Sequence, residues 1–351
     1  MQRGSSPRPI IEYVTTSDDG VNWIKIGDMP HFGRIVTSTE EKITKEGAKK
    51  SRQVNKGDLI LSNSMSYGLP YIMGIDGYIH DGWFVLKNFE NTFDKDYLCN
   101  LLISSAIQNQ YKRLAAGGVV QNISSDLVNS VSVSIPTMME QKKISSLLNL
   151  IDERIATQNK IIEDLKKLKS AISHILFSSK GAIHLSEIAN VVMGQSPSSN
   201  AYNDQGLGMP LVQGNLDISN GKTTPRLYTA EFNQTTEKGN IILTVRAPVG
   251  EVAKATQKVC LGRGVCAIIP HEENMSDFIY QYLTFYKFMW RRYEQGSTFT
   301  SINGSDVRNI FCPKVRNVSI LTLLDIKINI EERVVKQYQS QKQYMLYQMF
   351  I

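Results

Sequence analysis

Pro136-Thr-Met-Met-Glu140-Gln141-Lys-Lys-Ile144-Ser-Ser-Leu147-Leu148 begins a segment that predicts one long helix as far as about Phe177. The apolar residues of this segment mostly follow one another at intervals of three or four positions. They are Ile144, Leu147, Ile151, Ile161, Leu165, Leu168, Ile172 and Ile175. Such spacing predicts an apolar seam that packs against a partner helix, and the segment from Ile320 to the C-terminus is the candidate partner. A helix of roughly 40 residues would be about 60 Å long. The alternative is a surface helix packed on one domain.

A second apolar stripe lies beside this seam. Leu148, Ile155 and Ile162 recur every seven residues. A helix that is apolar over so wide a face is usually buried on both sides. We therefore expect this second stripe to contact a protein partner, or in part the globular regions of the chain.

Length and composition indicate a protein of two domains. A chain of 351 residues is too long for one ordinary core. No apolar run is long enough to cross a membrane, and the N-terminus lacks the apolar centre of a secretory signal. The cysteines Cys99, Cys260, Cys266 and Cys312 are scattered, as expected for reduced core residues in the cytoplasm. A net charge of +6 permits nucleic acid as a partner without requiring it.

The chain contains an internal repeat. Lys56-Gly57-Asp58-Leu59-Ile60-Leu61-Ser62 matches Lys238-Gly239-Asn240-Ile241-Ile242-Leu243-Thr244, an offset of 182 residues (239 − 57). Further matches follow in chain order: Gly4–Pro7 with Gly194–Pro197, Asp81–Leu86 with Arg263–Ile268, Ser125–Leu127 with Ser305–Val307, and Leu147-Leu148 with Leu323-Leu324. An ordered series of matches at a nearly constant offset indicates that one fold has been duplicated.

Each copy is predicted to be a globular domain followed by a long helix. The predicted boundaries are 1–135 and 136–180 for the first copy, and 181–315 and 316–351 for the second. Within the domains, short β-rich runs such as 59–62 and 83–86 surround an amphipathic helix, at Lys95–Leu114 and Met275–Gln295. We therefore predict an α+β fold, with two similar mixed domains separated by two long helices that form an antiparallel coiled coil.

The motifs that imitate catalytic sites lack the context that catalysis needs. Gly262-Arg263-Gly264 belongs to a loose dinucleotide fingerprint, but no helix follows it to bind a pyrophosphate. Asp28, Glu40 and Lys42 imitate a nuclease set at a spacing that is common in charged chains. The five histidines stand apart and suggest neither a metal site nor a triad. We therefore expect no catalytic residues and no metal, which favours a binding protein.

Equivalent loops of the two copies contain residue types that bind DNA. Arg and Ser are common phosphate ligands, and Asn, Gln and Arg can read base edges. Taken singly, each loop could be an ordinary solvated turn, but paired loops in two tethered copies suggest a binding role. The candidates are Arg3, Ser5, Ser6, Arg8, Asn63, Ser64, Tyr67, Gln121 and Asn122 in the first copy, and Gln195, Ser196, Gln213, Arg246, Arg263, Thr298 and Thr300 in the second.

Over its whole length the chain resembles the specificity subunits of type I restriction-modification enzymes. The resemblance rests on the 3–7 and 194–197 loops, the repeated Lys-Gly-Asp/Asn strands, and Ile135-Pro136 leading into Glu140-Gln141. It implies that each domain is a target-recognition domain that reads half of a split site in double-stranded DNA. The helices would act as a spacer and would dock methylation subunits, which the motor-nuclease subunits join.

The resemblance also implies that this chain performs no chemistry. Adenine-N6 methylation with S-adenosylmethionine, and DNA cleavage with ATP and Mg²⁺, would belong to the partner subunits, so no cofactor is expected here. The alternative is a coiled-coil protein-interaction scaffold without DNA specificity, which a test of salt-dependent DNA binding would distinguish. An enzyme with an unrecognised active site is a further alternative, for which the purified chain can be tested alone.

Two features depart from the family pattern. The second copy has a lead-in, Ile183–Asn190, before its Gly-Gln-Ser-Pro, whereas only two residues precede Arg3 in the first copy. We therefore expect the first strand or turn of the first copy to be missing from this sequence. In addition, the segment 312–317 lacks the Glu-Gln pair, and the seam of the C-terminal helix is less regular.

Overall fold

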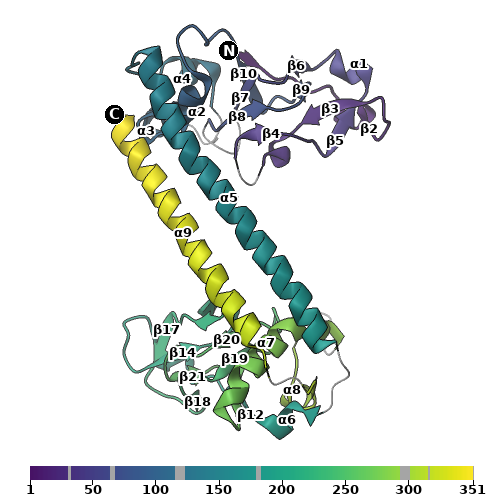
Figure 1. Cartoon of the computed structure of the whole chain (residues 1–351), viewed down its shortest axis with the longest axis vertical. Helices are drawn as coiled ribbons and strands as arrows, with labels where there is room; N and C mark the ends of the chain where they lie inside the picture. The colour runs from purple at the N-terminus through teal and green to yellow at the C-terminus, as the bar shows by residue number, and fades with distance from the viewer. Residues whose placement is uncertain are drawn as a thin grey trace. The chain divides into compact units, whose positions relative to one another are not determined.

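The computed structural model describes residues 1–30, 33–63, 68–114, 123–178, 183–292, 301–314 and 317–350. The chain divides into two compact units. Unit 1 comprises Met1–Ile161 and Glu332–Ile351, and unit 2 comprises Ile162–Glu331. Both units contain β-sheets and helices, as the α+β prediction expects (Figure 1).

Unit 1 contains two five-stranded sheets. In spatial order, the first has β1 (Gln2–Arg3), β10 (Trp83–Leu86), β7 (Leu59–Ser62), β8 (Pro70–Met73) and β4 (Ile35–Val36). The second has β2 (Val14–Thr15), β5 (Glu41–Ile43), β3 (Val21–Ile24), β9 (Gly77–Ile79) and β6 (Arg52–Val54). The helices of its globular part are α1 (Lys45–Ala48), α2 (Lys95–Ile103), α3 (Ser105–Leu114) and α4 (Ser125–Asn129).

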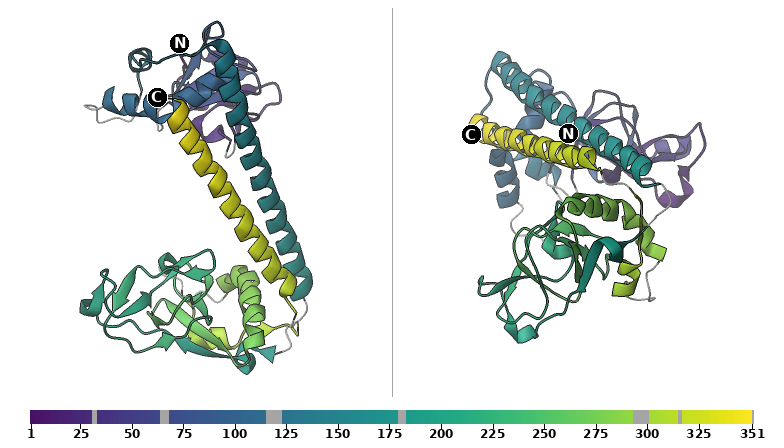
Figure 2. Two further views of the ribbon diagram at one scale, coloured as in Figure 1. Left: turned by 60° about the vertical axis from the view of Figure 1, so that its left-hand side comes forward. Right: turned by 60° about the horizontal axis from the view of Figure 1, so that its bottom comes forward.

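Unit 2 repeats this arrangement. Its first sheet has β12 (Ala189–Met193), β22 (Val265–Pro270), β19 (Ile241–Thr244), β20 (Val252–Lys254), β16 (Lys222–Thr223) and β15 (Ile218–Ser219). Its second has β13 (Tyr202–Asn203), β17 (Leu227–Thr229), β14 (Met209–Val212), β21 (Val259–Leu261) and β18 (Thr235–Thr236), and β11 (Ile183–His184) pairs with β23 (Phe311–Cys312). The helices of its globular part are α6 (Leu185–Ile188), α7 (Ser276–Tyr286) and α8 (Gly304–Arg308), and α7 packs against β19, β20 and β22. Figure 2 shows the ribbon of unit 2 from two further sides.

Strand register confirms the duplication. Leu61 pairs with Phe84 in unit 1, and Leu243 pairs with Cys266 in unit 2, each 182 residues later. The backbone N–H of Gly57 donates to the Met73 carbonyl at 2.7 Å, and Gly239 makes the equivalent bond to Ala255 at 2.8 Å. The predicted long amphipathic helices are shorter than expected, because the first breaks at Ser104 and the second continues beyond α7 as a 3-10 helix, Lys287–Arg292.

The glycine that opens each copy lies against another part of the backbone. A Cβ on Gly4 would be 2.0 Å from the carbonyl oxygen of His80, and a Cβ on Gly194 would be 2.1 Å from that of Gly262. No side chain fits at such a distance unless one of the two backbone segments moves. The glycine that opens each copy of the repeat is therefore required by packing.

We expect Gly4→Ala to lower the free energy of unfolding by more than about 2 kcal/mol, because the added methyl group would clash with a paired backbone. Gly27→Ala is the matched control, since a Cβ there meets nothing within 4 Å. Urea denaturation followed by tryptophan fluorescence would measure both variants, with Trp23 and Trp83 reporting on unit 1. Equal stability of the two variants would contradict the close approach at Gly4.

The two long helices are α5 (Met138–Phe177, 40 residues) and α9 (Ser319–Met349, 31 residues). A capping box begins α5: the Thr137 backbone N–H donates to the Glu140 carboxylate at 2.9 Å, and the Glu140 N–H donates to the Thr137 hydroxyl at 3.4 Å. The side chain of Gln141 is buried, donates to the Thr92 carbonyl at 3.0 Å and accepts from the Asp94 N–H at 2.8 Å. The Glu-Gln pair thus starts the helix and attaches it to the domain.

The structure corrects the expected faces of α5. The second stripe was expected to contact a partner subunit or, in part, the globular regions. Leu148 is fully buried in the core of unit 1, which agrees with the second of these expectations, while Ile162 is buried and Ile155 is half-buried, so this stripe is the inward face. Four residues of the expected seam are instead exposed, namely Leu147 at 39%, Ile161 at 40%, Leu168 at 49% and Ile175 at 80%. Both rows are apolar, so periodicity could not choose between them, and the contacts with the globular domain decide.

Within each unit, an ion pair between described residues joins the two long helices. In unit 1 the Asp152 carboxylate of α5 accepts from Lys342 Nζ of α9 at 2.5 Å. In unit 2 the Lys169 Nζ of α5 donates to the Asp325 carboxylate of α9, also at 2.5 Å. Gln281 of α7 donates to the other oxygen of Asp325 at 2.7 Å, which ties this pair to the globular part of unit 2.

Candidate nucleic-acid interface

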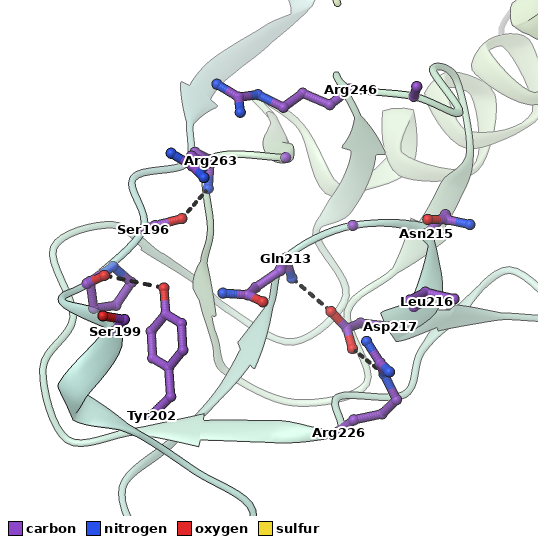
Figure 3. A pocket seen from close by; sticks show the side chains of 14 residues that line it. Ser196, Ser199, Tyr202, Gln213, Asn215, Leu216, Asp217, Arg226, Arg246 and Arg263 are labelled. Carbon is purple, nitrogen blue, oxygen red and sulfur yellow. Dashed lines mark hydrogen bonds and ion pairs between the residues drawn. The ribbon is translucent and has the colours of Figure 1, made fainter. Parts of the chain in front are cut away.

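A polar pocket of about 620 Å³ lies in unit 2 (Figure 3). Four of the predicted DNA-binding residues line it: Ser196, Gln213, Arg246 and Arg263. In the view of Figure 3, Arg246 and Arg263 lie on one side of the pocket, Asp217 and Arg226 lie on the other, and Gln213 lies between them. The structure therefore brings together residues that the sequence separates by up to 67 positions.

Two glycines place Arg263 beside Gln213. The Gly262 N–H donates to the Val212 carbonyl at the end of β14 at 2.8 Å. A Cβ on Gly264 would lie 2.1 Å from the carbonyl oxygen of Gln213. The Gly-Arg-Gly turn thus lies flat against the end of β14, and the backbone N–H of Arg263 donates to the Ser196 hydroxyl at 3.1 Å. This packing explains the glycines without a bound nucleotide.

The pocket has a positive rim. Arg246 and Arg263 are exposed, and neither forms an ion pair with any residue in the described part of the chain. Arg246 follows β19, where its backbone forms an isolated bridge with Ser301. Unpaired guanidinium groups on a rim are suited to phosphate oxygens, which they approach without having to break a bond to a carboxylate.

Two of the residues that line this pocket, Asp217 and Arg226, were not predicted from the sequence. Asp217 is only 2% exposed, and its carboxylate accepts from the backbone N–H of Gln213 at 2.8 Å and from Nε of Arg226 at 3.0 Å. No motif marks either residue. The available signal was an acidic residue five positions after the last residue of β14, where its carboxylate can accept the first backbone N–H beyond the strand.

In unit 1, four of the predicted residues meet at Asp81, which occupies the position equivalent to Arg263. Ser6 donates to the Asp81 carboxylate at 2.8 Å, and Arg8 forms an ion pair with it at 3.5 Å. Arg3 and Asn63 donate to the Asp81 carbonyl at 3.1 and 2.9 Å. Burial would raise the pKa of Asp81, but hydrogen bonds, that of Ser6 first, hold it below the usual value. The equivalent turn therefore presents a carboxylate, that of Asp81, in unit 1 and a guanidinium, that of Arg263, in unit 2.

Some predicted DNA contacts are not supported. Asn63 is 3% exposed and bonded within unit 1, so its side chain is not available to read a base. The Ser5 hydroxyl donates to the Lys50 carbonyl at 2.8 Å, and Gln195 is exposed but does not line the pocket. The remaining predicted residues lie outside the described residues: Ser64, Tyr67, Gln121, Asn122, Thr298 and Thr300.

The described residues offer little for catalysis. Asp28, which imitated part of a nuclease set, accepts the backbone N–H groups of Lys25 and Glu40 at 2.6 and 2.9 Å. Burial raises the pKa of Cys266 and of Cys312 to about 12, so these thiols stay protonated and unreactive. Across the described ranges, no cluster of three or more His, Cys, Asp or Glu side chains could hold a metal ion. Among the described helices, none is long and apolar enough to cross a membrane.

Comparison with known proteins agrees with the duplication. The sequence model of one protein family, the type I restriction modification DNA specificity domain, matches the chain twice, at residues 8–167 and 181–337. A putative type I restriction enzyme MjaX specificity subunit of Methanocaldococcus jannaschii is 29% identical over 334 residues, which cover 87% of this chain and 76% of that protein. The type I restriction enzyme HindI specificity subunit of Haemophilus influenzae is 28% identical over 131 residues, covering 36% of this chain and 28% of that protein.

Two solved structures share the fold. One, from a study of complex assembly and conformational transition of the type I R-M system, has a TM-score of 0.63 at 21% identity and covers 99% of this chain and 93% of its own. The other, the type I restriction-modification S subunit from M. genitalium, has a TM-score of 0.58 at 17% identity and covers 99% and 96%. With a family match that spans both copies, the chain belongs to the type I restriction-modification DNA specificity family, whose members recognise DNA sequence and leave catalysis to their partner subunits.

Proposed function

We propose that each globular domain binds one half of a split site in double-stranded DNA. The observation that carries this proposal is the pocket of unit 2, where Arg246, Arg263, Gln213 and Ser196 converge on one surface. Guanidinium and amide groups of this kind contact phosphates and base edges. Since Asp81 replaces Arg263 in the equivalent turn of unit 1, the two domains would read different half-sites.

The long helices would act as a spacer, paired antiparallel as a coiled coil. Support comes from the two ion pairs between α5 and α9, one in each unit. The residue numbers of Asp152 and Lys342 add up to 494, and so do those of Lys169 and Asp325. A constant sum is the signature of two antiparallel helices in one register. A paired helix cannot change its length without breaking that register, so we expect the unread gap between the half-sites to be constant.

The outward face of these helices would dock the methylation subunits. On α5 it presents the exposed row Leu147, Ile161, Leu168 and Ile175, and on α9 the exposed residues Ile320, Leu323, Ile326 and Ile330. Exposed apolar rows of this kind are typical of surfaces that contact a partner. Motor-nuclease subunits would join through the methylation subunits, which would bind S-adenosylmethionine, while ATP and Mg²⁺ would serve the motor-nuclease. The complex would act in the cytoplasm, in keeping with four buried free cysteines.

Salt dependence of DNA binding tests the proposal. Arg246→Ala and Arg263→Ala should each weaken binding to all sequences and reduce the slope of log affinity against log salt by about one unit, because each removes one phosphate contact. Binding should be measured with a long duplex at several salt concentrations. Lys167→Ala is the control, since that residue lies on α5 in an exposed ion pair with Glu163. A chain that binds no DNA at any salt concentration would support the scaffold alternative.

A further inference from the structure

One of the three arginines that line the pocket of unit 2, Arg226, is paired with a buried carboxylate. Nε of Arg226 donates to one carboxylate oxygen of Asp217 at 3.0 Å, and the other oxygen accepts the Gln213 N–H at 2.8 Å. The backbone of Asp217 is held as well, because its N–H donates to the Gly214 carbonyl at 3.1 Å and its carbonyl accepts from Thr224 at 2.8 Å. A carboxylate that is 2% exposed cannot easily move or lose its cation.

This arrangement leaves the outer edge of the Arg226 guanidinium for a ligand. The side chain is 57% exposed and lines the pocket, and in the described part of the chain only Asp217 pairs with it, through Nε. Its two terminal nitrogens are therefore available to donate a parallel pair of hydrogen bonds. Because the fork is already oriented, little conformational entropy is lost when such a pair forms.

The charge balance favours a base over a phosphate as that ligand. Asp217 largely neutralises Arg226 and would repel a nearby phosphate, whereas Arg246 and Arg263 on the rim have no such partner among the described residues. The guanidinium of Arg226 keeps its hydrogen-bond donors in the same geometry, although the pair that it forms with Asp217 has little net charge. Guanine O6 and N7 are the acceptor pair in the major groove that matches an arginine fork.

The equivalent place in unit 1 contains a carboxylate without an arginine. Asp28 accepts the Lys25 N–H at 2.6 Å, as Asp217 accepts that of Gln213, but its other oxygen accepts the backbone N–H of Glu40 at 2.9 Å. The side chain of Lys25 is paired with Glu41 at 2.7 Å. A carboxylate that caps the backbone after the strand is thus common to both copies, buried in unit 2 and half-buried in unit 1. Among the described residues, only the carboxylate of unit 2 pairs with a guanidinium.

We infer that Arg226, positioned by Asp217, reads one guanine in the half-site bound by unit 2. This inference rests on the proposed function, namely that unit 2 reads a half-site in DNA. It makes Arg226 a specificity-determining residue and Asp217 a positioning residue.

Selection from a library of random duplexes, using the full chain in its methylation complex, tests this inference. The wild type should select a guanine at one position of one half-site. Arg226→Ala should bind that sequence about tenfold to a hundredfold more weakly, bind the other three bases at that position almost as before, and keep the wild-type salt slope. The other half-site should be unchanged. Arg246→Ala is the matched control, because it should weaken all sequences alike and lower the slope.

Two further variants test the same inference if Arg226→Ala is poorly folded. Arg226→Lys retains the charge but lacks the planar fork that Asp217 orients, so it should weaken the guanine preference at an unchanged salt slope. Asp217→Asn should relax the same position only, without altering the other half-site. The inference is overturned if Arg226→Ala selects the wild-type sequence, or if it weakens all sequences equally with a smaller slope. If the wild type selects no sequence at all, the proposed function fails with it.

Discussion

Leu148→Ala is expected to lower the free energy of unfolding of unit 1 by about 2–5 kcal/mol, whereas Leu147→Ala should change it by less than about 0.5 kcal/mol. Leu148 is fully buried in the core cluster that also contains Tyr97, Leu101 and Leu346, so truncation leaves a cavity. Leu147 is 39% exposed and loses little on truncation. Urea denaturation followed by tryptophan fluorescence would give both values.

The same two variants separate folding from docking. If the exposed row of α5 contacts the methylation subunits, Leu147→Ala should fold normally but retain less of that partner when the complex is purified. Leu148→Ala should lose partner only in proportion to the protein that is unfolded. Unchanged stability of the Leu148 variant would show that the inward face of α5 has been assigned wrongly.

Asp152→Asn is expected to lower the free energy of unfolding of unit 1 by about 2–3 kcal/mol. This is somewhat less than the loss that follows when a fully buried ion pair is broken. The Asp152 carboxylate accepts from Lys342 at 2.5 Å and lies 3.5 Å from Arg34. Those two cationic side chains are only 15% and 17% exposed, while Asp152 is 34% exposed. Removing the one negative charge leaves two poorly hydrated cations close together, although asparagine keeps the shape of the side chain.

This loss should depend on pH. Burial, and then the charge of Arg34, already lowers the pKa of Lys342 below its ordinary 10.5, and removing Asp152 should lower it further. The unfolded chain then binds the Lys342 proton more tightly than the folded chain, so stability should rise with pH. The loss of unfolding free energy in Asp152→Asn is complete below the pKa that Lys342 has in the folded variant. It is recovered as the pH rises from that pKa toward 10.5.

Glu163→Ala is the control for this prediction. Glu163 pairs with Lys167 one turn away on α5, and both side chains are about two-thirds exposed. Its loss should cost less than about 0.5 kcal/mol and should not vary between pH 8 and 10. If Asp152→Asn and Glu163→Ala lowered the free energy of unfolding by similar amounts, solvent would have to screen the charges of Asp152, Lys342 and Arg34 fully. That result would contradict the burial of the two cations.

Local sequence was sufficient wherever neighbouring residues settle the conformation. The start of α5 at Thr137 and Glu140 follows from a capping box, which involves residues three apart. The duplication and the α+β class follow from matched glycines and strands, which leave the same pattern in each copy. Membership of the specificity family could be expected for the same reason.

Only the tertiary structure decided which row of α5 is buried and which side chains share a site. Leu147 and Leu148 are equally apolar, so the choice depended on the surface of the domain against which the helix packs. Arg3 meets Asp81 across 78 residues, and Arg263 meets Ser196 across 67, because strand pairing brings their loops together. Asp217 and Arg226 lie in connecting segments whose paths depend on the sheets beneath them. Contacts between distant segments leave no periodic trace in the sequence, since their energy is gained only once the chain has folded.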